Sequence, residues 1–186
     1  MILYHGTSYL KARRIIEHGF NIHAKPTWKV RGKKGFIYLS LAYAPFYSFA
    51  RNKTDRGAII KVEVAEDRLY PEDDFLMLAV KNKAVYTQKD LDSINIEKYK
   101  HLAVNSLQYL GNACTKAEDI KIIGMRDFDI TELIIACDPS ISPINYKIMG
   151  DYYKGLTEAL YTTGDWKNYA IDYNKRRFNM STEVIL

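Results

Sequence analysis

Apolar and polar residues along this chain alternate in short segments that predict strands and helices of unequal length. Five segments have the apolar alternation typical of strands: 1–4, 36–40, 58–64, 120–124 and 133–137. Four segments have apolar residues at helical spacing: 11–18, 41–51, 89–109 and 146–166. Gly19 and Gly111 stand where two of these helices end. Because the elements do not form regular β-α-β units, the pattern predicts an α+β fold rather than a doubly wound sheet.

The length of 186 residues predicts a single domain, 1–186, with a Tyr-rich helical C-terminal part from about residue 140. A formal charge of +5 makes the chain mildly basic, which favours polyanionic partners such as nucleic acid. No apolar run approaches the roughly 18 residues of a membrane span, and the N-terminus lacks signal-peptide features. We therefore expect a cytoplasmic protein that does not bind membranes.

The chain has two cysteines, Cys114 and Cys137, which are too few for a disulfide framework. Their spacing does not suit a metal site, so we expect no metal and two free structural thiols. Cys137 ends a predicted strand, and Cys114 is predicted to lie in a polar connection.

Two short motifs lie at predicted strands near the N-terminus. His5, Gly6 and Thr7 follow the first apolar run, and residues 35–40 read Gly-Phe-Ile-Tyr-Leu-Ser. One predicted helix and one polar, basic loop separate them. As an ordered pair, they bring an imidazole, a glycine backbone and the phenol of Tyr38 to the ends of two short strands. Such a site would bind a planar aromatic amide and a ribose.

This pair resembles the signature of ADP-ribosyltransferases of the poly(ADP-ribose) polymerase type. That family has His-Gly-Thr at the end of its first strand and a helix that ends in Gly. A Gly-x-Tyr-(Phe or Leu)-(Ala or Ser) motif follows, with an aromatic residue on the next helix. The chain matches this order, although Gly35 stands one residue further from Tyr38 than the family's glycine. The match is specific over residues 1–65 and extends in outline to about 140.

The resemblance implies a split β-sheet core with flanking helices, and NAD as the substrate that is cleaved at its nicotinamide–ribose bond. His5 would contact a hydroxyl of the nicotinamide ribose, and the backbone of Gly6 would bind the carboxamide. Tyr38 would stack on the nicotinamide ring. The further cofactor-binding residues it implies are Thr7, Ser40 and Phe49, with Phe49 closing the second face of the ring.

The third catalytic residue of the family is a Glu at the start of a later strand, where it binds the ribose and polarises the nucleophile. Glu118 precedes the apolar run 120–123 and is our first choice for this role. Gln108 and Asn112 stay open as alternatives, although neither amide acts as a base. The acidic cluster 72–74 is predicted to be a turn. Without a carboxylate here, transfer of single units or loss of activity is favoured over chain elongation.

Two basic regions suggest how an acceptor would bind. The loop 25–34 would neutralise the NAD diphosphate or a nucleic-acid backbone. The C-terminal aromatic residues, interleaved with Lys and Arg, resemble a surface on which unpaired bases stack, although aromatic stripes also form helix cores. Small bacterial and phage members of the family modify DNA or RNA, which implies a role as a toxin or in phage defence. We therefore predict a mono-ADP-ribosyltransferase that acts on nucleic acid in preference to protein.

Two other functions fit the same fold. An RNA 2′-phosphotransferase would need several arginines around its His, and only Arg13 and Arg14 of the first helix suggest that pattern. A non-catalytic module that binds NAD, ADP-ribose or nucleic acid would explain the absence of a clearly placed catalytic Glu.

Overall fold

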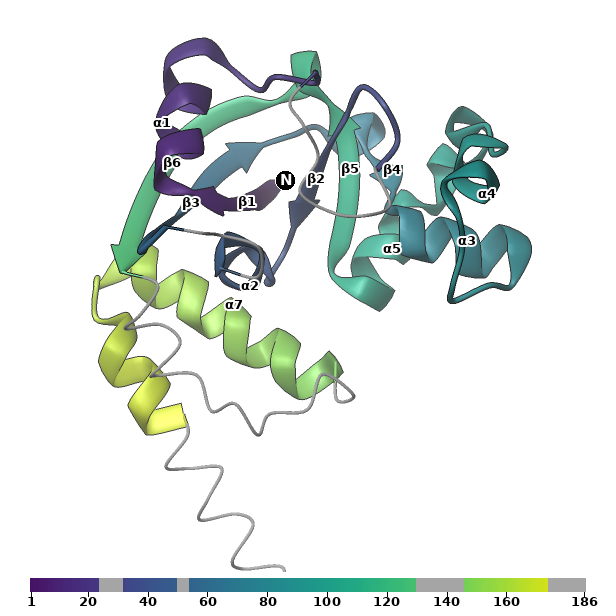
Figure 1. Cartoon of the computed structure of the whole chain (residues 1–186). Helices are drawn as coiled ribbons and strands as arrows, with labels where there is room; N and C mark the ends of the chain where they lie inside the picture. The colour runs from purple at the N-terminus through teal and green to yellow at the C-terminus, as the bar shows by residue number, and fades with distance from the viewer. Residues whose placement is uncertain (24–31, 50–53, 130–145, 174–186) are drawn as a thin grey trace, which may run out of the picture.

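The computed structural model describes residues 1–23, 32–49, 54–129 and 146–173 (Figure 1). Its six strands are β1 (Ile2–Ser8), β2 (Phe36–Ser40), β3 (Arg56–Glu63), β4 (Tyr70–Pro71), β5 (Asn112–Lys116) and β6 (Lys121–Asp129). They form one antiparallel sheet in the order β4-β5-β2-β1-β3-β6. The predicted α+β class is confirmed.

Helices flank the sheet along its length (Figure 1). The α-helices are α1 (Tyr9–His18), α2 (Ala44–Phe49), α3 (Asp73–Lys81), α4 (Gln88–Asp92), α5 (Ala103–Leu110) and α7 (Tyr146–Thr162). The 3-10 helices are η1 (Glu66–Arg68), η2 (Ile96–Leu102) and η3 (Ala117–Asp119). A further helical segment spans 166–173. As predicted, Gly19 and Gly111 end α1 and α5, each with positive φ and its N–H donated to a carbonyl of the last turn.

The sheet has two halves that meet at a narrow junction. β1 pairs with β3 along its whole length, from Ile2 opposite Glu63 to Ser8 opposite Gly57. Its pairing with β2 is limited to Tyr4 opposite Ser40. The half β1-β3-β6 and the half β2-β5-β4 are therefore joined at a single position. Beyond it, the end of β1 that carries His5 has no paired residue in β2.

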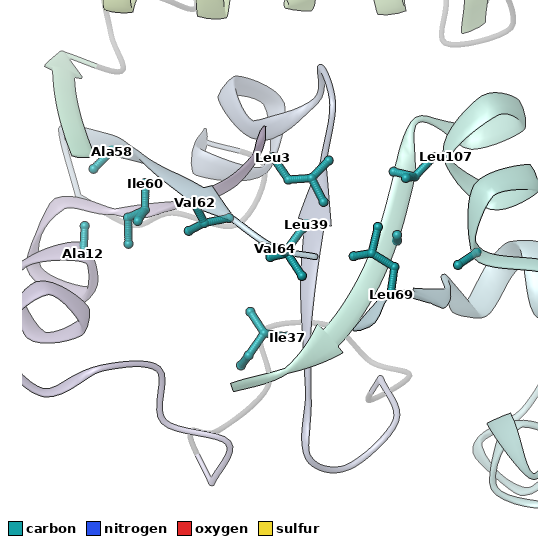
Figure 2. Close-up of a cluster of buried hydrophobic side chains, with 12 residues drawn as sticks. Leu3, Ala12, Ile37, Leu39, Ala58, Ile60, Val62, Val64, Leu69 and Leu107 are labelled. Carbon is teal, nitrogen blue, oxygen red and sulfur yellow. The ribbon is translucent and has the colours of Figure 1, made fainter. Parts of the chain in front are cut away.

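The main core covers one face of both halves (Figure 2). Leu3 of β1, Leu39 of β2 and Val62 of β3 are almost completely buried there. Ala12 of α1 and Leu107 of α5 belong to the same core. Since residues two apart in a strand share a face, Phe36 and Tyr38 lie on the other face of β2. There they pack against a separate cluster that includes Tyr70, Leu76 and Cys114.

The C-terminal helices form a core against the second face of the sheet, beside α2. Tyr152, Tyr153 and Trp166 are at most 6% exposed and pack with Phe128 of β6. These three rings are therefore core residues, and the base-stacking surface predicted from them is not formed by these side chains.

Several parts of the chain differ from the expected elements, and one of them is the predicted helix 89–109, which is divided into α4, η2 and α5. Residues 112–116 form β5, with Cys114 buried opposite Tyr38, although a polar connection was expected there. Residues 73–81 form α3 directly after Glu72, so the acidic cluster begins a helix instead of making a turn. β6 is longer than predicted and runs to Asp129. The predicted strand 133–137, including Cys137, lies outside the described residues.

The Leu3→Ala variant should lose about 2–5 kcal/mol of unfolding free energy, because Leu3 is completely buried at the junction of the two halves. Urea denaturation followed by circular dichroism measures this loss. Leu10→Ala on α1, where the side chain is 62% exposed, is the matched control and should change stability by less than about 0.5 kcal/mol. Equal effects of the two changes would contradict this core assignment.

Candidate functional site

The two motif strands meet through a hydrogen bond between His5 and the backbone of Tyr38. His5 Nδ1 lies 2.9 Å from the carbonyl oxygen of Tyr38. A carbonyl only accepts, so Nδ1 carries the proton and donates it. The bond lies just past the paired position at Tyr4, where β1 and β2 separate. The structure therefore brings His5 to the main chain of Tyr38 rather than to its ring.

The imidazole of His5 is neutral and can accept a hydrogen bond at Nε2. Burial lowers the pKa of His5, and the bond to the Tyr38 carbonyl offsets this only in part. The ring of Phe20 packs edge-on against the imidazole, with 5.2 Å between ring centroids. With the proton on Nδ1, the lone pair of Nε2 is the acceptor that the ring can offer to a ligand hydroxyl.

The phenol of Tyr38 is held at its hydroxyl by two protein groups. It donates to Asp73 Oδ2 at 2.5 Å and accepts from the backbone N–H of Lys33 at 2.6 Å. Burial, followed by the negative charge of Asp73, raises the pKa of Tyr38 well above its usual value, so the phenol stays protonated. Gly32 lies so close that an added Cβ would be 2.3 Å from a ring carbon of Tyr38. Tyr38 is therefore fixed between α3 and residues 32–33.

Gly6 and Thr7 continue β1 beside β3, opposite Ile59 and Ala58. A Cβ on Gly6 would lie 1.8 Å from the carbonyl oxygen of Ala44, because α2 packs directly on this part of β1. The glycine is therefore required by helix–strand packing, whether or not a ligand contacts its backbone.

Ser40 has a structural role that engages its hydroxyl fully. Its Oγ accepts from the N–H groups of Ala42 and Tyr43 and donates to the carbonyl of Gly111. This network ties the turn before α2 to the start of β5. Phe49 is the last residue of α2, and its side chain lies outside the described part of the structure.

The three candidates for the third catalytic residue lie in different places. Glu118 is exposed in η3, beyond Lys116 at the far end of β5. Gln108 is exposed on α5. Asn112 begins β5 directly opposite Ser40 and donates from Nδ2 to the hydroxyl of Tyr47 at 2.8 Å. The structure thus brings Asn112 next to the motif strand β2, and it does not do so for Glu118.

Asn112 has an unused acceptor. Its Oδ1 is buried and has no hydrogen-bond partner among the described residues. A buried amide oxygen without a donor costs roughly 1–3 kcal/mol, and because the protein covers Oδ1, a ligand hydroxyl could reach it only if neighbouring side chains move.

The acidic residues at the start of α3 are linked to Asn112 through Ser106. Glu72 caps the helix by accepting from the N–H groups of Asp74 and Phe75, and its own N–H donates to Ser106 Oγ. Ser106 Oγ in turn donates to the carbonyl of Asn112. Burial and the neighbouring charges of Asp74 and Asp73 raise the pKa of Glu72 to about 8. The sequence carries a signal for this helix start, since three acidic residues precede the apolar run 75–78.

Comparisons with protein-family models, with curated proteins and with solved structures found no match to this chain. Among the described residues, no group of three or more His, Cys, Asp or Glu side chains is arranged to hold a metal ion. In the same part of the chain, no helix is both long and apolar enough to cross a membrane.

Gly6→Ala should destabilise the protein by about 3 kcal/mol, at the upper end for overpacking, because the new methyl group would collide with backbone atoms of α2. Gly124→Ala is the matched strand control, since a Cβ there meets only ordinary contacts at 3.7 Å or more. Thermal and urea denaturation of both variants measure the difference. A Gly6→Ala variant as stable as Gly124→Ala would contradict the close packing of α2 on β1.

Glu72 should make the protein less stable as pH rises. Its pKa in the folded chain lies above the ordinary value of 4.5, so folding favours the protonated form. This contribution is complete below pH 4.5 and is lost as the pH rises through about 8. Glu72→Gln should therefore show a smaller fall in Tm between about pH 6.5 and 9 than the parent chain.

Calorimetry in a pH series measures this effect, and the window avoids His5, whose lowered pKa acts with the opposite sign at lower pH. Glu118→Gln changes an exposed carboxylate and should follow the parent chain. Parallel Tm profiles for Glu72→Gln and the parent would contradict the raised pKa of Glu72.

Proposed function

We propose that this protein is an NAD-dependent mono-ADP-ribosyltransferase that modifies a macromolecular acceptor, with nucleic acid favoured over protein by the basic charge of the chain. The observation that carries the proposal is the hydrogen bond from His5 Nδ1 to the Tyr38 carbonyl. It joins the two motifs that resemble the family signature, although they are 33 residues apart in the chain. It also selects one tautomer of the imidazole.

The state of His5 suits chemistry at a nicotinamide ribose. Cleavage of NAD passes through an oxocarbenium-like state, so positive charge develops on the ribose as nicotinamide leaves. A neutral imidazole accepts a hydrogen bond from a ribose hydroxyl at Nε2 without placing a second positive charge beside this centre. Burial, which lowers the pKa of His5, keeps the ring in this state at neutral pH.

The narrow junction of the sheet also supports the proposal. The family is expected to have a split sheet, and here the halves are paired only between Tyr4 and Ser40. His5 and Gly6 lie on the separated side of this junction. Their backbone and side-chain groups are therefore next to a part of β2 with which β1 makes no ladder.

Asn112 has the position that best fits the third member of the site. It begins β5 beside β2, and the carbonyl oxygen of its side chain lacks a donor among the described residues. A ribose hydroxyl would supply that donor once the side chains that cover Oδ1 move aside. Since an amide does not act as a base, this arrangement favours transfer of single ADP-ribose units over chain elongation. It also favours a second candidate, a module that binds NAD without turning it over.

The protein should bind NAD and transfer label from it to DNA or RNA oligonucleotides. Calorimetry measures binding, and incubation with labelled NAD measures transfer and glycohydrolysis. His5→Ala should weaken NAD binding about 3- to 10-fold, the worth of one hydrogen bond, and reduce transfer by about 100-fold or more. Its matched control is His18→Ala, since the His18 side chain is 77% exposed at the end of α1.

Other outcomes of these assays distinguish the alternative functions. Binding without transfer or hydrolysis would identify the non-catalytic module. Loss of the 2′-phosphate from a 2′-phosphorylated RNA only in the presence of NAD would favour the phosphotransferase. Transfer of label from NAD that persists in both His5→Ala and Tyr38→Ala would contradict the proposed function.

A further inference from the structure

We infer that Asp73 is a positioning residue that fixes the ring of Tyr38 for nicotinamide binding, acting through the phenol hydroxyl. The role in binding rests on the proposed function. The structural coupling between Asp73 and Tyr38 is tested separately from it.

The hydroxyl of Tyr38 makes hydrogen bonds to two protein groups. It donates its only proton to Asp73 Oδ2 and accepts from the Lys33 N–H. These partners come from α3 and from the end of the segment before β2, on two sides of the phenol. With the hydroxyl held at two points and Gly32 against the ring, Tyr38 has one orientation available.

Asp73 is well placed to direct Tyr38, and capping of α3 does not require it. Glu72 already accepts the N–H groups at the helix start. Asp73 is only 4% exposed, and its second oxygen, Oδ1, has no hydrogen-bond partner among the described residues. A carboxylate buried in this way is costly, and an apolar or amide side chain would serve packing alone at lower cost. Its contact with Tyr38 gives the carboxylate a function.

One residue thus connects α3 to β1. The hydroxyl of Tyr38 is bound by Asp73, and the carbonyl of the same residue is bound by His5 Nδ1. A change in the charge of Asp73 therefore acts on the residue that also orients the imidazole.

Several charged or titratable groups face Asp73. At the start of α3 these are the N-cap residue Glu72 and Asp74, and from other elements they are Lys33, Tyr38, Tyr86 and Cys114. Burial raises the pKa of Asp73 to about 6, and Asp74 acts in the same direction. The hydrogen bond from Tyr38 and the proximity of Lys33 oppose this shift. Asp73 should therefore be ionised at neutral pH and protonated near pH 5, where its bond to the phenol weakens.

The coupling is tested first without NAD. Carboxyl ¹³C chemical shifts in a pH series give the pKa of Asp73 in the parent chain and in Tyr38→Phe, which removes only the hydroxyl. The pKa should be about 6 in the parent chain and higher in Tyr38→Phe, because the lost hydrogen bond stabilises the ionised form. Tyr161→Phe removes a hydroxyl that donates to the carbonyl of Ile59 and is the matched control. An unchanged Asp73 pKa in Tyr38→Phe would overturn the inference.

The functional arm measures NAD affinity by calorimetry between about pH 5 and 7.5. Affinity of the parent chain should fall about 10-fold toward pH 5, and Asp73→Asn should bind about 10-fold more weakly at pH 7.5 with a flatter pH profile. Asp73→Glu should restore part of the pH dependence. Asp92→Asn, at an exposed position on α4, is the control and should match the parent chain.

Equal affinity and equal pH profiles in Asp73→Asn and the parent chain would overturn the positioning role. If the parent chain does not bind NAD at all, the proposed function fails, and the role of Asp73 in nicotinamide binding fails with it. The ¹³C titration then still decides whether Asp73 fixes Tyr38. Should Asp73→Asn not fold, Tyr38→Phe provides the same binding comparison.

Discussion

β1 and β2 are paired at one position, yet both strands bury side chains in the same core. Leu3 and Leu39 belong to one buried core, and this shared burial holds the two halves of the sheet together where strand pairing does not. Beyond Tyr4, the backbone groups of β1 do not pair with β2. The hydrogen bond between His5 and Tyr38 lies where the two strands separate. The candidate site therefore depends on a sheet whose halves are joined by a shared core and not by continuous strand pairing.

The electrostatics of the site follow from the elements that surround it. α3 brings three successive acidic residues to the side of the sheet that carries Tyr38, and burial raises the pKa of Glu72 and Asp73. Burial has the opposite effect on the pKa of His5, where it disfavours the imidazolium. The same physical cause therefore gives a neutral imidazole on one strand and carboxyl groups that titrate close to neutral pH near the other.

Two residues of the sequence motif have structural duties that the motif alone does not reveal. The absence of a side chain at Gly6 admits the carbonyl of Ala44, and the hydroxyl of Ser40 links the turn before α2 to Gly111, the residue before β5. The packing at Gly6 leaves its backbone in the strand, whereas the Ser40 hydroxyl is already engaged by protein groups. Both duties do mean that these residues would be needed for folding in any protein with this packing.

Local pattern was enough to determine several elements of this protein. The bounds of β2, the end of α1 at Gly19 and the end of α5 at Gly111 depend on residues that are adjacent in the chain, through strand alternation and the left-handed backbone that glycine adopts readily. The His-Gly-Thr and Tyr-Leu-Ser motifs could also be found from the sequence.

Only the tertiary structure determined which other residues lie beside the two motifs. β5 is short and has no long apolar alternation, and it is a strand because β2 and β4 pair with it from both sides. That pairing brings Asn112 beside the site and leaves Glu118 at the opposite end. Asp73 is 35 residues from Tyr38 in the chain, and no local pattern encodes a contact at that distance. Such contacts depend on how the strands and helices pack, and this packing determines which carboxylate meets the phenol.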